Sequence, residues 1–102
     1  MLRVLIAEDE DMIRKGLVYT TDWLSMGCVV VAEAGDGKEG FEKILECRPD
    51  VVITDICMPY VDGMELSHYL HDHCPEVKII IFSGFGEFEY AKKAIQYNVS
   101  EY

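Results

Sequence analysis

Basic residues and long apolar runs are both scarce in this sequence. Only 9 lysines and arginines stand against 19 aspartates and glutamates, which gives a formal net charge of -10. A chain of this charge repels phosphate backbones, so we expect no direct binding of DNA or RNA by this segment. The same charge favours metal cations or a basic partner surface. No apolar run approaches the roughly 20 residues that a membrane helix needs, so no membrane association is expected.

Paired cysteines are also lacking. The four cysteines are far apart and form no CxxC motif; they are Cys28, Cys47, Cys57 and Cys74. The first seven residues lead directly into Glu8 and Asp9, without the longer apolar stretch and cleavage site of a signal peptide. We therefore expect a cytoplasmic protein whose cysteines are free thiols.

The 102 residues, half of them hydrophobic, predict a single domain that spans residues 1–102. Short runs rich in β-branched residues alternate with segments of helical spacing. The expected strands cover residues 3–7, 28–34, 51–54 and 78–82. Two of these runs are continuously apolar, Val51-Val52-Ile53 and Ile79-Ile80-Ile81-Phe82, which is typical of parallel strands covered on both faces.

Four helices are expected between and after these strands. They run from Asp11 to about Trp23, from Asp36 to before Pro49, from Asp62 to before Pro75, and over residues 87–97. Asp36 and Asp62 are each followed three residues later by a glutamate, a pattern that marks helix N-termini. The order βαβαβαβα with right-handed crossovers predicts an α/β fold with a doubly wound parallel sheet.

Acidic and hydroxyl side chains follow three of the predicted strands. Glu8 and Asp9 come after the first strand, Asp55 after the third and Ser83 after the fourth. In open parallel sheets, ligands bind outside these carboxyl ends. If the first and third strands are neighbours, three carboxylates converge and repel one another, and Mg²⁺ would relieve that repulsion. Asp55 could then attack phosphorus while Ser83 donates a hydrogen bond to the transferred group.

Less specific explanations compete with this one. Acidic residues at the start of a helix are stabilising there, and for Glu10 and Asp11 we favour this explanation. For Glu8, Asp9 and Asp55, spacing alone leaves a functional site and simple capping both open. A second cluster holds three histidines and a cysteine near the end of the third helix; these are His68, His71, His73 and Cys74. Imidazoles are favoured at a helix C-terminus, so we do not expect a transition-metal site there.

Three segments together resemble the receiver domains of bacterial response regulators. Residues 5–10 are similar to the first-strand acidic motif of that family, and residues 79–84 to its fourth strand with a hydroxyl residue. Residues 51–59, followed by Asp62-Gly63, are similar to its phosphoacceptor motif. The three motifs occur in order across the whole chain. The resemblance implies a flavodoxin-like receiver fold with strand order 2-1-3-4-5, a property of the family that periodicity does not supply.

The resemblance also implies roles for individual residues. Asp55 would be the phosphoacceptor, receiving its phosphoryl group from a sensor histidine kinase. The domain would thus be a regulatory phosphoacceptor and not an enzyme. The cofactor would be Mg²⁺ (or Mn²⁺), held by Asp55, by Asp9, by Glu8 through a water, and by the backbone carbonyl of Cys57. Ser83 would hydrogen-bond the phosphoryl group.

Other implications concern the regulator as a whole. Tyr102 matches the aromatic residue that acts with Ser83 as a switch in the family. Family members continue through a fifth strand with a lysine and a fifth helix, which this sequence lacks, so we expect a C-terminally incomplete receiver from a longer regulator. The open edge of the fourth strand would favour a homodimer. Residues 20–27, with Trp23, and residues 83–91 are similar to receivers fused to AraC-type output domains, so a missing part would contact DNA.

Two other function classes compete with the phosphoacceptor. An aspartate-nucleophile phosphatase resembles the pattern D-x-D, whose second aspartate is the general acid, but Asp55-Ile56-Cys57 supplies no such acid. A pseudo-receiver, an interaction module that takes no phosphate, stays open as an alternative because the family's lysine is absent from the sequence.

Overall fold

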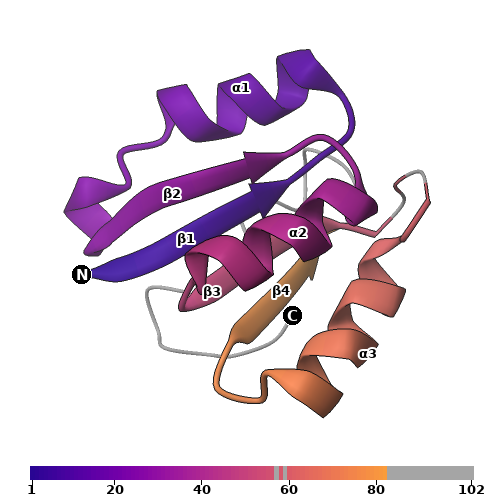
Figure 1. Ribbon diagram of the computed structural model, residues 1–102. Helices are drawn as coiled ribbons and strands as arrows, with labels where there is room; N and C mark the ends of the chain where they lie inside the picture. Colours follow the sequence, from indigo (N-terminus) through magenta and orange to yellow (C-terminus); the bar gives the residue numbers. More distant parts are fainter. Residues whose placement is uncertain (57, 59, 83–102) are drawn as a thin grey trace.

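The computed structural model describes residues 1–56, 58 and 60–82 (Figure 1). Strands and helices alternate along the chain, as the sequence predicts. The elements are β1 (Leu2–Ala7), α1 (Asp11–Thr20), the short 3₁₀ helix η1 (Leu24–Met26), β2 (Cys28–Ala34), α2 (Gly37–Cys47), β3 (Val51–Asp55), α3 (Gly63–His73) and β4 (Lys78–Phe82).

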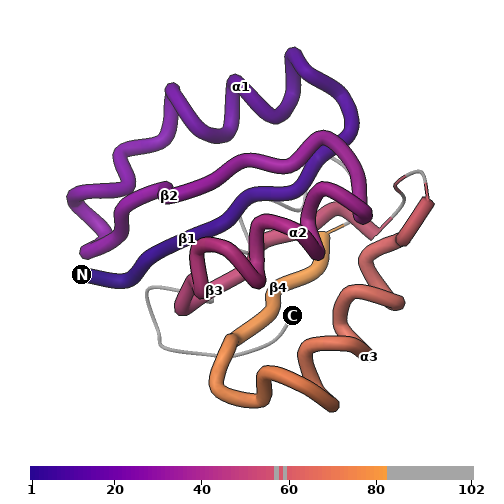
Figure 2. The backbone as a smooth tube through the Cα atoms, viewed as in Figure 1, coloured from indigo at the N-terminus to yellow at the C-terminus, as the bar shows by residue number. Residues whose placement is uncertain are grey.

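The strands form one parallel sheet in the order β2-β1-β3-β4. The central pair is β1 and β3, with Val4 opposite Val51 and Ala7 opposite Thr54. Figure 2 shows the path, in which the chain leaves β1, crosses to the edge strand β2 and returns past β1 to β3. The predicted α/β fold with a doubly wound parallel sheet is confirmed for the described residues. The family's fifth strand and the predicted helix over residues 87–97 lie outside them.

Helices cover both faces of the sheet (Figure 1). Alternate residues of β1 divide between two cores: Val4 and Ile6 pack with Leu17 of α1, whereas Leu5 and Ala7 pack with residues of α2 and α3. Every one of these β1 side chains is fully buried. The continuous apolar runs of the sequence are therefore explained by burial on both faces.

The capping residues at the starts of α2 and α3 behave as predicted. The side chain of Asp36 accepts a hydrogen bond of 2.8 Å from the backbone N–H of Glu39. The side chain of Asp62 accepts one of 2.9 Å from the N–H of Glu65. Each bond satisfies a donor that the first turn of a helix leaves without a partner.

Helix α1 is shorter than predicted. The sequence suggested a helix to about Trp23, but α1 ends at Thr20, and Trp23 lies in the turn that precedes η1. The indole Nε1–H of Trp23 folds back and donates to the carbonyl oxygens of Leu17 and Val18, at 3.2 and 3.1 Å. Carbonyls in the last turn of a helix lack partners within the helix, so this side chain satisfies two of them.

Two further expectations can be compared with the described residues. Cys28, Cys47 and Cys74 are free, as predicted, while Cys57 lies outside the described residues. Burial raises the pKa of the Cys28 thiol, which keeps this side chain protonated. In the part of the chain that the structure describes, no helix is both long and apolar enough to cross a membrane.

Candidate functional site

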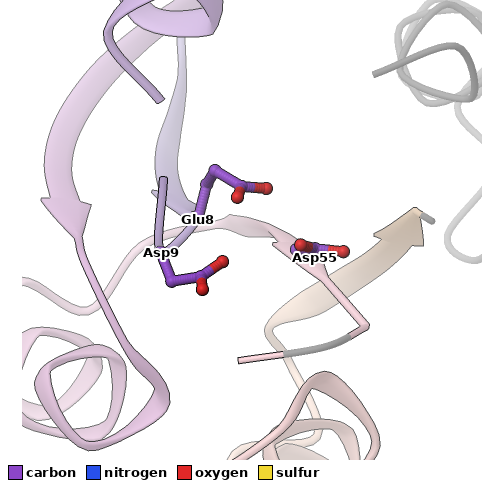
Figure 3. A group of neighbouring side chains, drawn as sticks. All are labelled: Glu8, Asp9 and Asp55. Atoms are coloured by element: carbon purple, nitrogen blue, oxygen red, sulfur yellow. The ribbon is translucent and has the colours of Figure 1, made fainter. Parts of the chain in front are cut away.

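Three carboxylates meet at the carboxyl end of the two central strands. Glu8 and Asp9 follow β1 directly, and Asp55 is the last residue of β3. Because Ala7 lies opposite Thr54 in the sheet, the residues that follow each of them are brought to the same edge. One oxygen from each carboxylate lies within 4.8 Å of the others (Figure 3). We call Glu8, Asp9 and Asp55 the acidic trio.

The members of the trio differ in their exposure. Glu8 is only 3% exposed, Asp55 is partly buried, and Asp9 is exposed. Burial is the main cause that raises the pKa of Glu8, to about 8; the backbone N–H of Glu10, which donates to Glu8 Oε1 at 3.1 Å, opposes this, and the charge of Asp55 adds to it. A proton on Glu8 therefore relieves part of the repulsion within the trio near neutral pH.

A divalent cation fits the same group of atoms. The trio offers only carboxylate oxygens, the donors that Mg²⁺ prefers, and they are close enough to reach one ion. A divalent cation at this place would replace the proton on Glu8 and offset two of the three negative charges. In the described part of the chain, no other group of three or more His, Cys, Asp or Glu side chains is close enough to hold a metal.

The carboxyl end of β3 is held from three directions. The N–H of Ile56, the residue after Asp55, donates to the carbonyl of Phe82 in β4 at 2.9 Å, and the N–H of Gly63 donates to the carbonyl of Ile56 at 3.0 Å. The hydroxyl of the buried Thr54 donates to the carbonyl of Asp55 at 3.0 Å. The backbone that carries the Asp55 carboxylate is therefore fixed before any ligand binds.

The β1–α1 turn, which presents Glu8 and Asp9, is fixed by a residue that the sequence analysis missed. Nη1 of Arg14 donates to the carbonyl of Glu8 at 2.9 Å, and the N–H of Glu8 donates to the carbonyl of Ala34 at 3.0 Å. The sequence held only a weak signal for this contact: Arg14 stands three residues after Asp11, a spacing that brings opposite charges together on a helix.

The other predicted residues fall into two groups. Glu10 and Asp11 are exposed and stand outside the acidic trio; Glu10 occupies the N-cap position of α1 without a capping bond from its side chain, and Asp11 pairs with Arg14 at 2.7 Å. Cys57, Ser83 and Tyr102 lie outside the described residues, so the roles predicted for them stay predictions.

Ordinary structural roles account for two of the histidines near the end of α3. His71 and His73 stand in the last turn of the helix, where a positive charge is favourable. The ring of His73 lies 4.6 Å from that of Tyr69, which in turn lies edge-on to Phe41. Packing explains His73 without a metal.

Comparison with known proteins places the site in a family. Residues 4–102 match the family described as response regulator receiver domain. The chain is 43% identical over 102 residues to the transcriptional regulatory protein YesN of Bacillus subtilis, covering all of this chain and 28% of YesN. It is 37% identical over 103 residues to the transcriptional regulatory protein HptR of Staphylococcus aureus, covering 40% of HptR. The chain therefore spans less than half the length of these relatives.

Solved structures agree with the sequence matches. The receiver domain of AraT, a response regulator from Geobacillus stearothermophilus, superposes with a TM-score of 0.78 at 42% identity, covering 99% of this chain and 78% of that one. The two-component transcriptional regulator AraC from Clostridium phytofermentans gives 0.74 at 33% identity, covering 88% and 73%. With an acidic trio at the expected strand ends and a family match over nearly its whole length, the chain belongs to the response regulator receiver domains, which are regulatory phosphoacceptors and not enzymes.

Proposed function

We propose that Asp55 accepts a phosphoryl group from the phosphohistidine of a sensor histidine kinase, in a reaction that requires Mg²⁺ or Mn²⁺. The observation that carries this proposal is the approach of the three carboxylates to within 4.8 Å at the carboxyl ends of β1 and β3. A cation would relieve the repulsion among carboxylates packed this closely, and a carboxylate beside a cation is a suitable nucleophile for phosphorus.

The proposed transfer exchanges a phosphorus–nitrogen bond of the donor for a phosphorus–oxygen bond to Asp55. A carboxylate oxygen of Asp55 forms a bond to phosphorus while the bond from phosphorus to the donor imidazole nitrogen breaks. The electron pair of that bond stays on the imidazole nitrogen. The imidazole leaves as the neutral ring if its other nitrogen already carries a proton, and otherwise takes up one proton from water to become neutral. The product is a mixed anhydride of Asp55 and phosphate. A bound Mg²⁺ would supply positive charge against the phosphoryl oxygens. Stabilising the negative charge on these oxygens is the main contribution that a protein makes to such a transfer.

Position favours Asp55 over the other two carboxylates as the acceptor. Glu8 is nearly inaccessible, and its N–H and carbonyl are both bonded to neighbouring elements. Asp55 stands between the β1 carboxylates on one side and Phe82, its partner in β4, on the other. In our proposal, Asp9 and Asp55 hold the metal together with Glu8, which acts through a water, and with the backbone carbonyl of Cys57. Ser83, which follows Phe82 in the sequence, would donate a hydrogen bond to the phosphoryl group.

We further infer that phosphorylation switches the output of a longer transcription regulator. YesN, HptR and AraC are named as transcriptional regulators, and this chain covers only 28% of YesN and 40% of HptR. The receiver charge of -10 is unsuited to DNA, so an output domain would make that contact. Ser83 and Tyr102 would transmit the switch. The active form would be a homodimer, and the site of action would be the cytoplasm.

Intact mass spectrometry tests the phosphoacceptor directly. Acetyl phosphate or phosphoramidate with Mg²⁺ should add one phosphoryl group to the chain, and a chelator should suppress the addition. The Asp55→Asn variant should stay unlabelled, whereas Asp72→Asn, the same chemical change at an exposed position of α3, should label normally. Labelling of Asp55→Asn would refute the assignment, and an unlabelled wild-type chain would favour the pseudo-receiver.

A further inference from the structure

Arg14 joins three segments of the chain behind the acidic trio. Its Nη1 donates to the carbonyl of Glu8 at 2.9 Å, its Nη2 to Asp11 Oδ1 at 2.7 Å, and its Nε to Glu33 Oε1 at 3.3 Å. These partners are the residue that follows β1, the first residue of α1 and a residue of the edge strand β2. The Arg14 side chain is only 12% exposed. One guanidinium therefore ties together the elements that surround the β1–α1 turn.

The bond to Glu8 acts on the peptide that presents the metal ligands. The carbonyl of Glu8 belongs to the peptide unit that links Glu8 to Asp9. The N–H of Glu8 is held by the carbonyl of Ala34 at 3.0 Å, so the Glu8 backbone is bonded on both sides. Rotation of the Glu8–Asp9 peptide would swing the Asp9 carboxylate away from Asp55, and Arg14 opposes that rotation.

The guanidinium is itself held in place. The hydroxyl of Tyr19 donates to Glu33 Oε2 at 3.2 Å, which orients the carboxylate that binds Arg14. A Cβ on Gly35 would lie 3.2 Å from Nη1 of Arg14, so the lack of a side chain there leaves room for the guanidinium. Burial lowers the pKa of Arg14, but the carboxylates of Asp11 and Glu33 more than offset this and raise it. Arg14 is therefore permanently charged.

The charge of Arg14 is directed to carboxylates outside the trio. Its two ion pairs are with Asp11 and Glu33, and its contact with the trio is to a neutral carbonyl. We propose that Arg14 is a positioning residue, which sets the affinity of the acidic trio for Mg²⁺ by fixing the Glu8–Asp9 peptide. This inference rests on the proposed function, because it assigns a role toward the metal that the trio would bind.

Calorimetric titration with Mg²⁺ at fixed pH and ionic strength tests the inference. Arg14→Gln should weaken Mg²⁺ binding about 10-fold or more, the range found when residues that orient metal ligands are removed. Arg14→Lys should weaken Mg²⁺ binding to a similar extent, because an ammonium group cannot make three bonds in the fixed directions of a guanidinium. Lys15→Gln removes the same charge from the next, exposed position of α1 and should bind Mg²⁺ within about twofold of the wild type.

A second readout separates positioning from loss of structure. At saturating Mg²⁺, Arg14→Gln should be phosphorylated by acetyl phosphate at a rate close to that of the wild type, because only the affinity for the metal has changed. Circular dichroism with a chelator present should show each variant folded at the temperature of the titration. If Arg14→Gln does not fold, Arg14→Lys and Glu33→Gln decide, since Glu33→Gln loosens Arg14 without touching the trio.

Three outcomes would overturn the inference. The first is wild-type Mg²⁺ affinity in both Arg14→Gln and Arg14→Lys. If Arg14→Gln does not fold, the same outcome is wild-type affinity in both Arg14→Lys and Glu33→Gln. The second is a loss in Lys15→Gln as large as that in Arg14→Gln, which would mean that charge alone matters. The third is wild-type affinity in Arg14→Lys with a loss in Arg14→Gln. A wild-type chain that binds no Mg²⁺ would instead refute the proposed function, so the two failures are distinguishable.

Discussion

Gly63 lies against the backbone of Asp55. A Cβ built on Gly63 would come within 2.5 Å of the Asp55 carbonyl oxygen and 3.0 Å of the Ile56 Cα, distances that no side chain can accommodate without movement. The N–H of Gly63 also donates to the carbonyl of Ile56 at 3.0 Å. The first residue of α3 therefore sets the position of the end of β3.

We predict that Gly63→Ala displaces the end of β3 and lowers both stability and phosphorylation. Overpacking of this kind destabilises by about 1–3 kcal/mol. The control is Gly16→Ala in the middle of α1, where a Cβ would meet nothing within 4 Å. That substitution should stabilise the fold by roughly 0.5–1 kcal/mol, because alanine is the better helix former. Urea denaturation of both variants should therefore give shifts of opposite sign; a stabilised Gly63→Ala would contradict the close contact.

A second prediction concerns repulsion within the acidic trio. In chelator, Asp55→Asn and Asp9→Asn should each melt at a higher temperature than the wild type, because each removes one charge from the cluster. Mg²⁺ should stabilise the wild type, by about 2.7 kcal/mol at a hundredfold excess over its dissociation constant, and stabilise the variants less. Asp72→Asn serves as the control with no change expected. Identical melting of all the proteins in both buffers would show that the three carboxylates do not interact.

A third prediction is a pH dependence that arises from Glu8. Its pKa is raised from 4.5 to about 8 in the folded protein, mainly by burial. Between these values the folded protein holds a proton that the unfolded chain has released. The contribution of Glu8 to the free energy of unfolding is therefore fully present below about pH 4.5 and is lost as the pH rises through about 8. One such group contributes a slope of at most about 1.4 kcal/mol per pH unit.

Melting with a chelator present, at several pH values across this interval, measures the effect. Glu8→Gln, which is neutral at every pH, should flatten the profile, and saturating Mg²⁺ should do the same to the wild type. Glu46→Gln is a control for the loss of an exposed carboxylate on α2, and its profile should keep the wild-type slope. A wild-type profile that rises between pH 5 and 8 with chelator present would contradict the buried, protonated state of Glu8.

The strands were predictable because their signal is local. All four predicted strands agree with the observed ones to within one residue; β1 begins one residue earlier and β3 ends one residue later than expected. Burial on both faces forces continuous apolar runs, and these are visible in one sequence. The order of the strands came from resemblance to the family, since periodicity contains no information on which strands pair. The end of α1 was predicted wrongly because it depends on a bond from Trp23 back to Leu17 and Val18.

The site was predictable only in part. Glu8, Asp9 and Asp55 stand next to strand ends, so topology alone brings them together, and the structure agrees. The near-complete burial of Glu8 could not be predicted from the sequence, because the acidic residues that follow it are typical of an exposed segment. Arg14 was missed because its role depends on Glu33, which is 19 residues away on another element. Contacts of that kind are decided by packing and leave no local pattern.

A last prediction concerns Trp23, the single tryptophan of the chain. Trp23 is 5% exposed, packs in the core beneath α1, and donates from Nε1 to the carbonyls of Leu17 and Val18. Trp23→Phe should lower the free energy of unfolding by about 1–3 kcal/mol. The lost hydrogen bond accounts for roughly 1 kcal/mol, and the smaller ring leaves a cavity that accounts for the rest.

Urea denaturation followed by circular dichroism measures this change, since the variant has no tryptophan fluorescence. Tyr19→Phe is the control: it also removes a hydrogen-bonding group from an aromatic ring on the same segment, but Tyr19 is 72% exposed, so a change within about 0.5 kcal/mol is expected. Trp23 contacts the end of α1 that lies farthest along the helix from Glu8 and Asp9. Mg²⁺ affinity should therefore stay unchanged in Trp23→Phe, and a loss there as large as in Arg14→Gln would mean that any loosening of α1 disturbs the acidic trio.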